Sequence, residues 1–192
     1  MTDKSIIQQA LGEQWDVLPP ALQAHYTAAN NADVGALDID YPSWMQWFLN
    51  VLHWMGALLN QRGKGFATRV EKRMEGERQY WDRTISLPDA KDMYFTSTWV
   101  YAGGNRLIEY VNPVMGICME VHVDDGKLYY EGCYFVFRLA GLKIPLPEWL
   151  LLGHTTIVET AVDESHFNMD FRLVHPLFGQ IYRYAGRFST KV

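Results

Sequence analysis

The sequence predicts a single α+β domain in which N-terminal helices pack on a strongly curved antiparallel sheet of about eight to nine strands. The 192 residues suffice for one domain with a sizeable core, because 48% of them are hydrophobic and 20% are charged. The apolar pattern changes from a helical period to strand-like alternation at about residue 65. We therefore divide the domain 1–192 into a mainly helical part, 1–62, and an antiparallel β part, 63–192, whose sheet curls into a half-open or closed barrel.

The helical part begins with two short predicted helices. Ser5 and Gln8 have the spacing of a capping box, which predicts a helix start at this point. Pro19 and Pro20 suit the first turn of a second helix, ALQAHYTAA. The segment NNADVGALDIDYP, residues 30–42, is rich in loop-forming residues and is interpreted as a loop.

A third predicted helix spans residues 43–60 and is rich in tryptophan. Its polar positions recur every three or four residues, which predicts an amphipathic helix with one buried face. The residues expected on that face are Trp44, Trp47, Phe48, Val51, Leu52, Met55, Leu58 and Leu59. Gln46, Asn50 and His53 interrupt the apolar run, whereas a spanning helix needs roughly 20 largely apolar residues. The sequence thus predicts no transmembrane segment, and peripheral membrane contact through this helix stays open.

The β part contains nine short segments with strand-like alternation. They read FATRVEKRM, RQYWDRTISL, DMYFTSTWVY, RLIEYVN, VMGICMEVHV, KLYYEGCYFVFRL, TTIVETAV, HFNMDFRLV and QIYRYAGRF. Between them lie breaks typical of turns, such as EGE, PDAK, AGGN, DDG, VDES and HPLFG. Short strands joined by tight turns favour an antiparallel meander.

The stretch FRLAGLKIPLPEWLLLGH, residues 137–154, interrupts this pattern. Pro145 and Pro147 prevent a continuous helix or strand. Pro147 and Gly153 suit the two ends of a single helical turn. We therefore expect a connection that places apolar side chains, Trp149 among them, at one end of the core. It acts either as a plug or as a lid over an apolar cavity.

Composition and motifs exclude several functional classes. The formal net charge of −5 gives no support to nucleic-acid binding. Cys118 and Cys133 do not form a disulfide framework, and the N-terminal segment has no signal-peptide pattern, so we expect a cytoplasmic protein. The six histidines show no metal-ligand spacing and no nucleotide fingerprint occurs, so neither a metal site nor a cofactor is predicted.

Two charged residues lie on apolar strand faces. Alternate side chains of a strand share a face, so Arg83 lies beside Trp81, and Glu109 lies on the apolar face of its own strand. Inward charges are costly unless they are paired or partly hydrated, so Arg83 and Glu109 either pair on the concave side of the sheet or lie at strand ends and reach water. The pair is either structural or a polar anchor for a ligand headgroup. Tyr182 and Tyr184 could add hydroxyl contacts.

Five motifs occur in a recognisable order: LGEQWDVLPPALQAHY, ERQYWDR, GGNRLIEYVNP, GLKIPLPEWL and FRLVHPLFGQIYRYAGRF. Their order and spacing resemble the bacterial domain-of-unknown-function family 4166, over about residues 10 to 190. The resemblance implies the architecture rather than an activity. Members also occur fused behind short-chain or saccharopine-type reductase domains, so any assisting role of this chain is expected to act in trans. Trp44, Trp47 and Trp54 depart from the more Leu- and Arg-rich helix of that family.

We first interpret the sequence as a non-enzymatic binding module for a small apolar or amphipathic ligand, such as a fatty acid or isoprenoid, held in the concavity of the sheet. Aromatic residues at 14%, the inward charges and the apolar connection support this hypothesis. An anionic headgroup would lie near Arg83. No catalytic residue is assigned; the candidate ligand-binding residues are Trp81, Arg83, Glu109, Trp149, Tyr182 and Tyr184.

Two alternatives remain. The chain could be an interaction or accessory protein that docks through the Trp-rich helix 43–60, in which case Trp44 or Trp47 would be exposed. It could also be a hydrolase or isomerase that uses Glu109 or a buried Asp as a base. The sequence identifies neither the ligand nor the oligomeric state.

Overall fold

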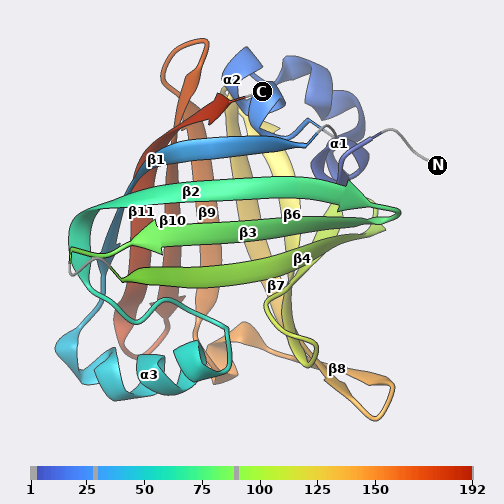
Figure 1. Cartoon of the computed structure of the whole chain (residues 1–192). Coiled ribbons are helices and arrows are strands. Elements are labelled where there is room, and N and C mark those ends of the chain that lie inside the picture. The colour runs from blue at the N-terminus through green and yellow to red at the C-terminus, as the bar shows by residue number, and fades with distance from the viewer. Residues whose placement is uncertain (1–3, 28–29, 89–90, 192) are drawn as a thin grey trace.

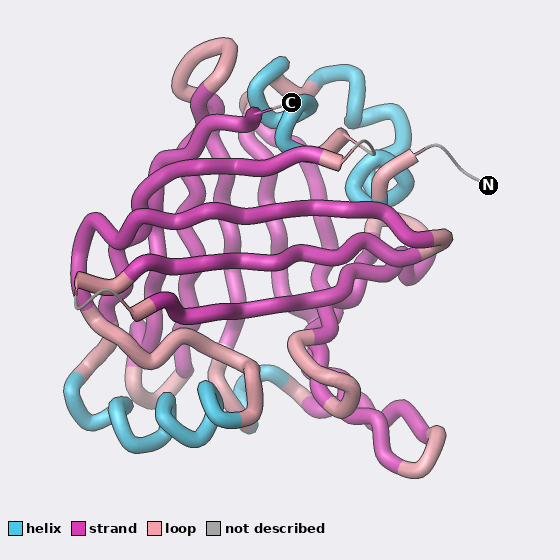
Figure 2. The backbone as a smooth tube through the Cα atoms, viewed as in Figure 1, coloured by secondary structure: helices cyan, strands magenta, loops and turns pink. Residues whose placement is uncertain are grey.

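The chain folds as a barrel of antiparallel strands with short helices at both ends, as the computed structural model in Figure 1 shows. The structure describes residues 4–27, 30–88 and 91–191. Two helices and a 3-10 turn cover one end of the barrel, and a third helix lies across the other end, beside a projecting hairpin (Figures 1 and 2).

In the described part of the chain, eleven strands form one antiparallel sheet. They are β1 (Asn31–Asp40), β2 (Gly63–Glu75), β3 (Arg78–Ser86), β4 (Asp92–Gly103), β5 (Arg106–Tyr110), β6 (Met115–Asp124), β7 (Lys127–Leu139), β8 (Leu142–Leu146), β9 (His154–Ala161), β10 (His166–His175) and β11 (Gly179–Lys191). Their hydrogen-bonded order is β6-β5-β4-β3-β2-β1-β11-β10-β9-β7-β8, and β6 also pairs with β7. That pairing closes a ring of ten strands, since β8 is attached to β7 outside the ring.

The expected α+β fold with a curved antiparallel sheet is confirmed, in its closed form. All nine segments predicted as strands are strands. The count rises to eleven because β1 and β8 were not predicted. β8 forms a short hairpin with the end of β7 and projects from the barrel (Figure 1).

The prediction of a loop over residues 30–42 was wrong, because β1 occupies Asn31–Asp40 and pairs with both β11 and β2. The N-terminal part is therefore not only helical. The strand was not predicted because its sequence contains three aspartates and a glycine, which are residue types that strands disfavour. Leu37 and Ile39 are buried while the intervening Asp38 is exposed, which is the alternation of a strand. A Cβ at Gly35 would lie 2.6 Å from the Phe188 ring, so glycine permits this close approach.

The first two helices follow the expected start signals. α1 spans Ile6–Leu11, and its capping box is present: Ser5 Oγ accepts from the Gln8 amide, and the Ser5 amide donates to Gln8 Oε1. A 3-10 helix, η1 (Gly12–Val17), leads to α2 (Pro20–His25), which has Pro20 at its first position. The apolar faces of α1 and α2 are buried against the core of the barrel.

The Trp-rich helix is shorter than predicted, and only part of its expected apolar face is buried: Leu52, Leu58 and Leu59 are buried as predicted. α3 spans Gln46–Trp54, after a 3-10 turn, η2 (Ser43–Met45). Its buried residues are Leu49 and Leu52, whereas Trp44 and Trp47 are exposed at 51% and 70%. The expectation that both tryptophans are buried was wrong. Two apolar stripes coexist on this helix, and periodicity alone does not decide which one packs inward.

The connection at 137–154 contains one short helical turn, as expected. This turn is the 3-10 helix η3 (Glu148–Leu150), which follows Pro147 and is succeeded by Gly153. Within the described part of the chain, no helix is both long enough and apolar enough to cross a bilayer.

Candidate ligand cavity inside the barrel

The barrel contains a cavity of about 120 Å³ that is partly open to solvent. Most of its lining is apolar, and strands from all round the ring contribute to it. The ionisable side chains that line it are His25, Tyr26, Asp33, Arg83, Glu109, Tyr130, Glu159 and Tyr184. A largely apolar cleft or cavity with a few convergent polar groups is the usual form of a small-molecule site.

Stacked aromatic rings build part of the wall. Trp81 on β3 and Trp99 on β4 have ring centroids 4.4 Å apart, and both are 3% exposed. On β10 and β11, Phe171 and Tyr184 are direct partners across the ladder and stack at 4.5 Å. Within the described residues, neither Trp81 Nε1 nor Trp99 Nε1 has a hydrogen-bond acceptor. A buried donor without a partner needs an explanation, and a ligand oxygen is one.

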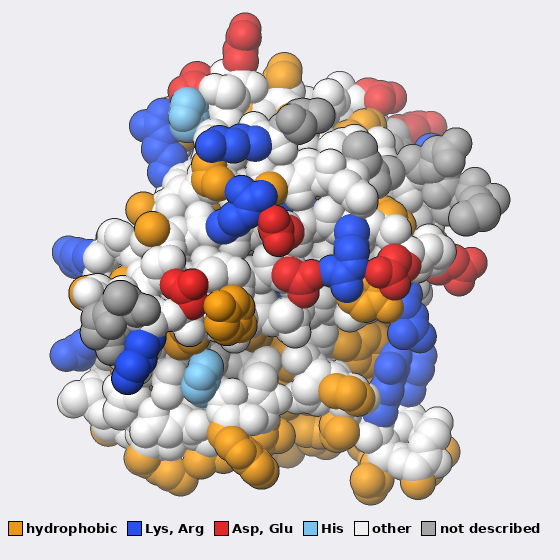
Figure 3. All heavy atoms as spheres, viewed as in Figure 1, with side chains coloured by type: hydrophobic (Ala, Val, Ile, Leu, Met, Phe, Trp, Pro, Cys, Tyr) orange, Lys and Arg blue, Asp and Glu red, His pale blue; other side chains and the backbone are white. Residues whose placement is uncertain are grey.

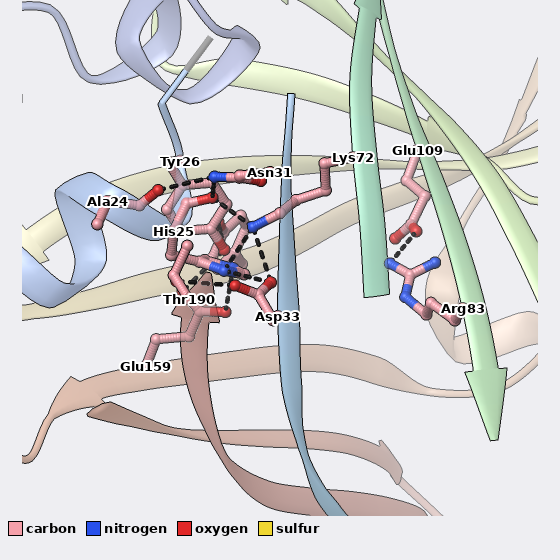
Figure 4. A network of polar contacts seen from close by, with 11 residues as sticks. Ala24, His25, Tyr26, Asn31, Asp33, Lys72, Arg83, Glu109, Glu159 and Thr190 are labelled. Carbon is pink, nitrogen blue, oxygen red and sulfur yellow. Dashed lines mark hydrogen bonds and ion pairs between the residues drawn. The ribbon is translucent and has the colours of Figure 1, made fainter. Parts of the chain in front are cut away.

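An ion pair between Arg83 and Glu109 also lines the cavity (Figure 4). Arg83 Nη2 lies 3.2 Å from Glu109 Oε1, and Arg83 Nη1 donates to Ser97 Oγ at 2.9 Å. The guanidinium group also faces Trp81, at 5.4 Å, and Phe95, at 5.0 Å. The pairing expected from strand alternation is therefore present. Both side chains are largely buried, so neither charge is fully compensated by water.

A second polar group, which we call the inner cluster, consists of His25, Tyr26, Asp33, Lys72, Tyr130 and Glu159. Each of these residues is less than 9% exposed. Asp33 Oδ2 lies 2.7 Å from Lys72 Nζ and 2.8 Å from His25 Nδ1 (Figure 4). Neither of these short contacts has the geometry of a hydrogen bond, and the contact with Lys72 is an ion pair. Asp33 Oδ1 accepts a hydrogen bond from Thr190 Oγ1 at 2.8 Å.

A hydrogen-bonded chain of hydroxyls completes the inner cluster. Tyr130 Oη donates to Tyr26 Oη at 2.5 Å, and Tyr26 Oη donates to Glu159 Oε2 at 2.7 Å. The other carboxyl oxygen, Glu159 Oε1, lies 3.7 Å from His25 Nε2. The chain thus runs from Tyr130 on β7, through Tyr26 just after α2, to Glu159 on β9. Glu159 in turn lies near His25 at the end of α2.

Burial sets the charge states of these groups. It lowers the pKa of His25 to about 4, so the ring is neutral at pH 7. Burial alone would raise the pKa of Asp33, but the contacts with His25 and Lys72 outweigh it and hold that pKa at about 2. Because His25 is neutral, Lys72 is the cation that balances Asp33. Burial raises the pKa of Glu159 to about 8, so this carboxyl is mostly protonated at pH 7.

The structure brings four of the six predicted site residues together around the cavity: Trp81, Arg83, Glu109 and Tyr184. Tyr182 is not part of the lining; it is fully buried and its hydroxyl donates to the Leu59 carbonyl at 2.9 Å. Trp149 lies on the outer surface and is 61% exposed.

Sequence reasoning missed the inner cluster, although a signal for two of its members was available. Lys72 shares the inward face of β2 with Phe66 and Val70, and Glu159 shares that of β9 with Ile157. The alternation that identified Arg83 identifies both. His25 and Asp33 gave no such signal, since one ends a helix and the other lies in the segment interpreted as a loop.

The fold and the cavity define a class: a closed antiparallel β-barrel whose largely apolar interior contains paired, buried ionisable side chains. Comparison with family models then identifies the chain. It belongs to the family described as "Domain of unknown function (DUF4166)", whose model matches residues 18–188. The resemblance expected from the sequence motifs is thereby confirmed. The search of curated proteins returned no match.

Proposed function

We propose that this barrel binds one small amphipathic molecule, with its apolar body against the aromatic wall and its polar end at the two indole donors and the adjacent Arg83–Glu109 pair. The observation that carries the proposal is the combination, in one largely apolar cavity, of buried charge pairs and two indole N–H groups that have no acceptor among the described residues. Such groups are costly in a core and useful in a binding site.

The charges of the cavity favour an uncharged polar end. Arg83 is balanced by Glu109, Lys72 is balanced by Asp33, and His25 is neutral at pH 7. An anionic head, as expected from Arg83 alone, would compete with Glu109 for the guanidinium group. A hydroxyl or carbonyl oxygen would instead accept from the free indole donors without removing a counter-ion.

The volume limits the enclosed part of the ligand. A space of about 120 Å³ is similar to the engineered cavity of about 150 Å³ that holds benzene. The enclosed part is therefore a single ring or a short chain. The free thiols of Cys118 and Cys133 favour a reducing compartment, so we place this activity in the cytoplasm. The net charge of −5 makes nucleic acid an unfavourable partner.

Native mass spectrometry of gently purified protein, followed by solvent extraction, tests the proposal. We expect a one-to-one adduct of low mass, present at purification or after incubation with a mixture of medium-chain and aromatic alcohols. In the double variant Arg83→Met/Glu109→Gln, which removes both charges together, we expect the affinity to fall roughly tenfold to a hundredfold.

The control is Arg73→Met/Asp82→Asn. This pair also joins an arginine and an acid across neighbouring strands, but both side chains are about 40% exposed on the outside of the barrel. The control variant should retain the adduct. A bare protein mass in every preparation, including those incubated with the alcohols, would remove the proposal.

A second candidate, an acid–base enzyme, is favoured by one observation. Glu159 has a pKa of about 8, lines the cavity, and lies 3.7 Å from the neutral His25 ring. A carboxyl with such a pKa can give and take a proton near neutral pH. The extraction separates the two candidates: a binding module yields the same molecule from the wild type and from Glu159→Gln, whereas an enzyme yields product from the first and unreacted substrate from the second.

A further inference from the structure

The end of the barrel where α3 lies carries an extended apolar surface. Figure 3 shows hydrophobic side chains gathered along this edge of the molecule, over α3 and around the β8 hairpin. Trp47 and Trp54 on α3 are 70% and 86% exposed, and Trp149 of η3 is 61% exposed. Leu142 of the hairpin and Leu177 of the β10–β11 turn are also exposed. We call this set the apolar end surface.

The fold does not need these tryptophans for its core. α3 buries Leu49 and Leu52 against the barrel. Trp47, Val51 and Trp54, at positions i, i+4 and i+7, form a separate stripe that is exposed. The surface is continuous with the neighbouring turn, since the Trp44 ring lies 5.5 Å from the ring of Phe178.

The segments that form the apolar end surface carry few exposed charges, and these are cationic. The segments 43–60, 138–153 and 174–178 contain three charged residues in all: Arg138, Lys143 and Glu148. Glu148 is buried, and its carboxylate is bonded to His154 at 2.7 Å and to the Thr155 amide at 3.1 Å. These three residues sum to +1, so the rest of the chain carries −6 of the total of −5. An anionic surface would attract this end and repel the remainder.

The segments that form the apolar end surface also wall the cavity. Leu58 and Leu59 follow α3 and line the cavity, and Leu152 does so immediately after η3. A surface that contacts lipid at this end would therefore share chain segments with the wall of the cavity.

We propose that the apolar end surface docks on a lipid bilayer. Tryptophan favours the headgroup region of a bilayer, where an amphipathic helix lies in the plane of the interface. Lys143 at the hairpin faces anionic lipid. Separate projecting elements, a helix, a hairpin and a turn, suit a fluid interface that adapts to each of them. This inference goes beyond the ligand-binding proposal and does not depend on it, because the surface and the cavity are different sites.

Co-sedimentation with vesicles tests the docking. The full chain is mixed with vesicles of phosphatidylcholine alone or with 30% phosphatidylglycerol, a composition chosen to add negative charge (about a third of the headgroups). We expect binding to the anionic vesicles that falls roughly tenfold in Trp47→Ser/Trp54→Ser and falls also in Lys143→Glu. Val17→Ser/Val162→Ser, which removes exposed apolar side chains outside the apolar end surface, should bind like the wild type.

Circular dichroism melting confirms that each variant is folded before it is compared. If the wild type binds neither kind of vesicle, the proposal is overturned. So does wild-type self-association in sedimentation velocity that the tryptophan variant abolishes, without vesicle binding, because the surface would then be a contact between copies of this chain. The cavity variant Arg83→Met/Glu109→Gln should still bind vesicles, which separates failure of docking from failure of ligand binding.

Discussion

At the scale of single residues, the most unusual feature is a lysine and an aspartate that face each other inside the barrel. The side chains of Lys72 and Asp33 are each 1% exposed, and their charged atoms are 2.7 Å apart. Lys72 Nζ also donates to the His25 carbonyl at 2.5 Å. Desolvation of two charges is expensive, and their mutual attraction offsets it only while both are present.

Removal of one partner should therefore cost far more than removal of both. Asp33→Asn is expected to lower the free energy of unfolding by roughly 3–5 kcal/mol, because it leaves the buried ammonium of Lys72 without an anion. Urea denaturation monitored by circular dichroism measures this change. Asparagine keeps an oxygen for the hydrogen bond from Thr190, so the effect reports the charge.

The double variant Asp33→Asn/Lys72→Met provides the control. It removes both charges, so most of the lost stability should return. If Asp33→Asn alone were as stable as the wild type, Lys72 would not be charged in the folded protein.

At the scale of elements, one histidine holds the η3 turn against the barrel. His154, at the start of β9, contacts Glu148 of η3 through Nδ1 at 2.7 Å and Glu131 of β7 through Nε2 at 2.8 Å. Partial burial acts to lower the pKa of His154, but the two carboxylates outweigh it and raise the pKa above the usual 6.5. A protonated imidazole donates to both carboxylates, so protonation strengthens the link.

The link should weaken as pH rises. Because the folded-state pKa of His154 is raised, its contribution is complete below the unfolded value of 6.5 and is lost as pH rises through the folded value. The amide of Thr155 donates to Glu148 Oε1, so it reports the link directly. We expect its hydrogen-exchange protection factor, corrected for intrinsic rates, to decrease over this pH range.

Two comparisons make this result specific. His154→Gln should give low protection that no longer depends on pH. The amide of Met115 donates to the side-chain carbonyl of Asn112 at 2.7 Å, and that acceptor does not titrate in the range, so its protection should stay constant. Equal behaviour of the Thr155 and Met115 amides would argue against a role for His154.

At the scale of the whole molecule, ring closure makes every strand of the barrel depend on two neighbours. β6 and β7, adjacent in the sequence, close the ring, while β1, from the N-terminal part, pairs with β11 at the other end of the chain. One large hydrophobic cluster includes residues of α1, α2, α3 and the barrel. The boundary near residue 62 is therefore not expected to separate two folding units.

We expect a single cooperative unfolding transition. In urea, tryptophan fluorescence and far-ultraviolet circular dichroism should give the same midpoint, because the cavity-lining Trp81 and Trp99 lose their surroundings when the barrel opens. Trp47→Ser/Trp54→Ser should leave this agreement unchanged, since both of those residues are exposed. A fluorescence transition well before the loss of circular dichroism would indicate that a part of the chain unfolds on its own.

Local patterns in the chain were sufficient for several parts of the structure. Nine strands, the capping box of Ser5 and Gln8, and the pairing of Arg83 with Glu109 were predicted correctly. Each depends on side chains two to four residues apart within one element, or on the cost of an unpaired inward charge. The same alternation would have located Lys72 and Glu159.

Other parts were decided by residues far apart in the sequence. β1 exists because β2 and β11 pair with it on both sides, and Asp33 is tolerated inside because Lys72 and His25 meet it there. Packing against the barrel determines which face of α3 is exposed: Leu49 is buried against the barrel and Trp47 stays outside. The hydrophobic periodicity and the composition of a segment indicate which of its side chains can be buried. Which face it buries, and which charges meet, depends on the surfaces that the rest of the fold presents to it.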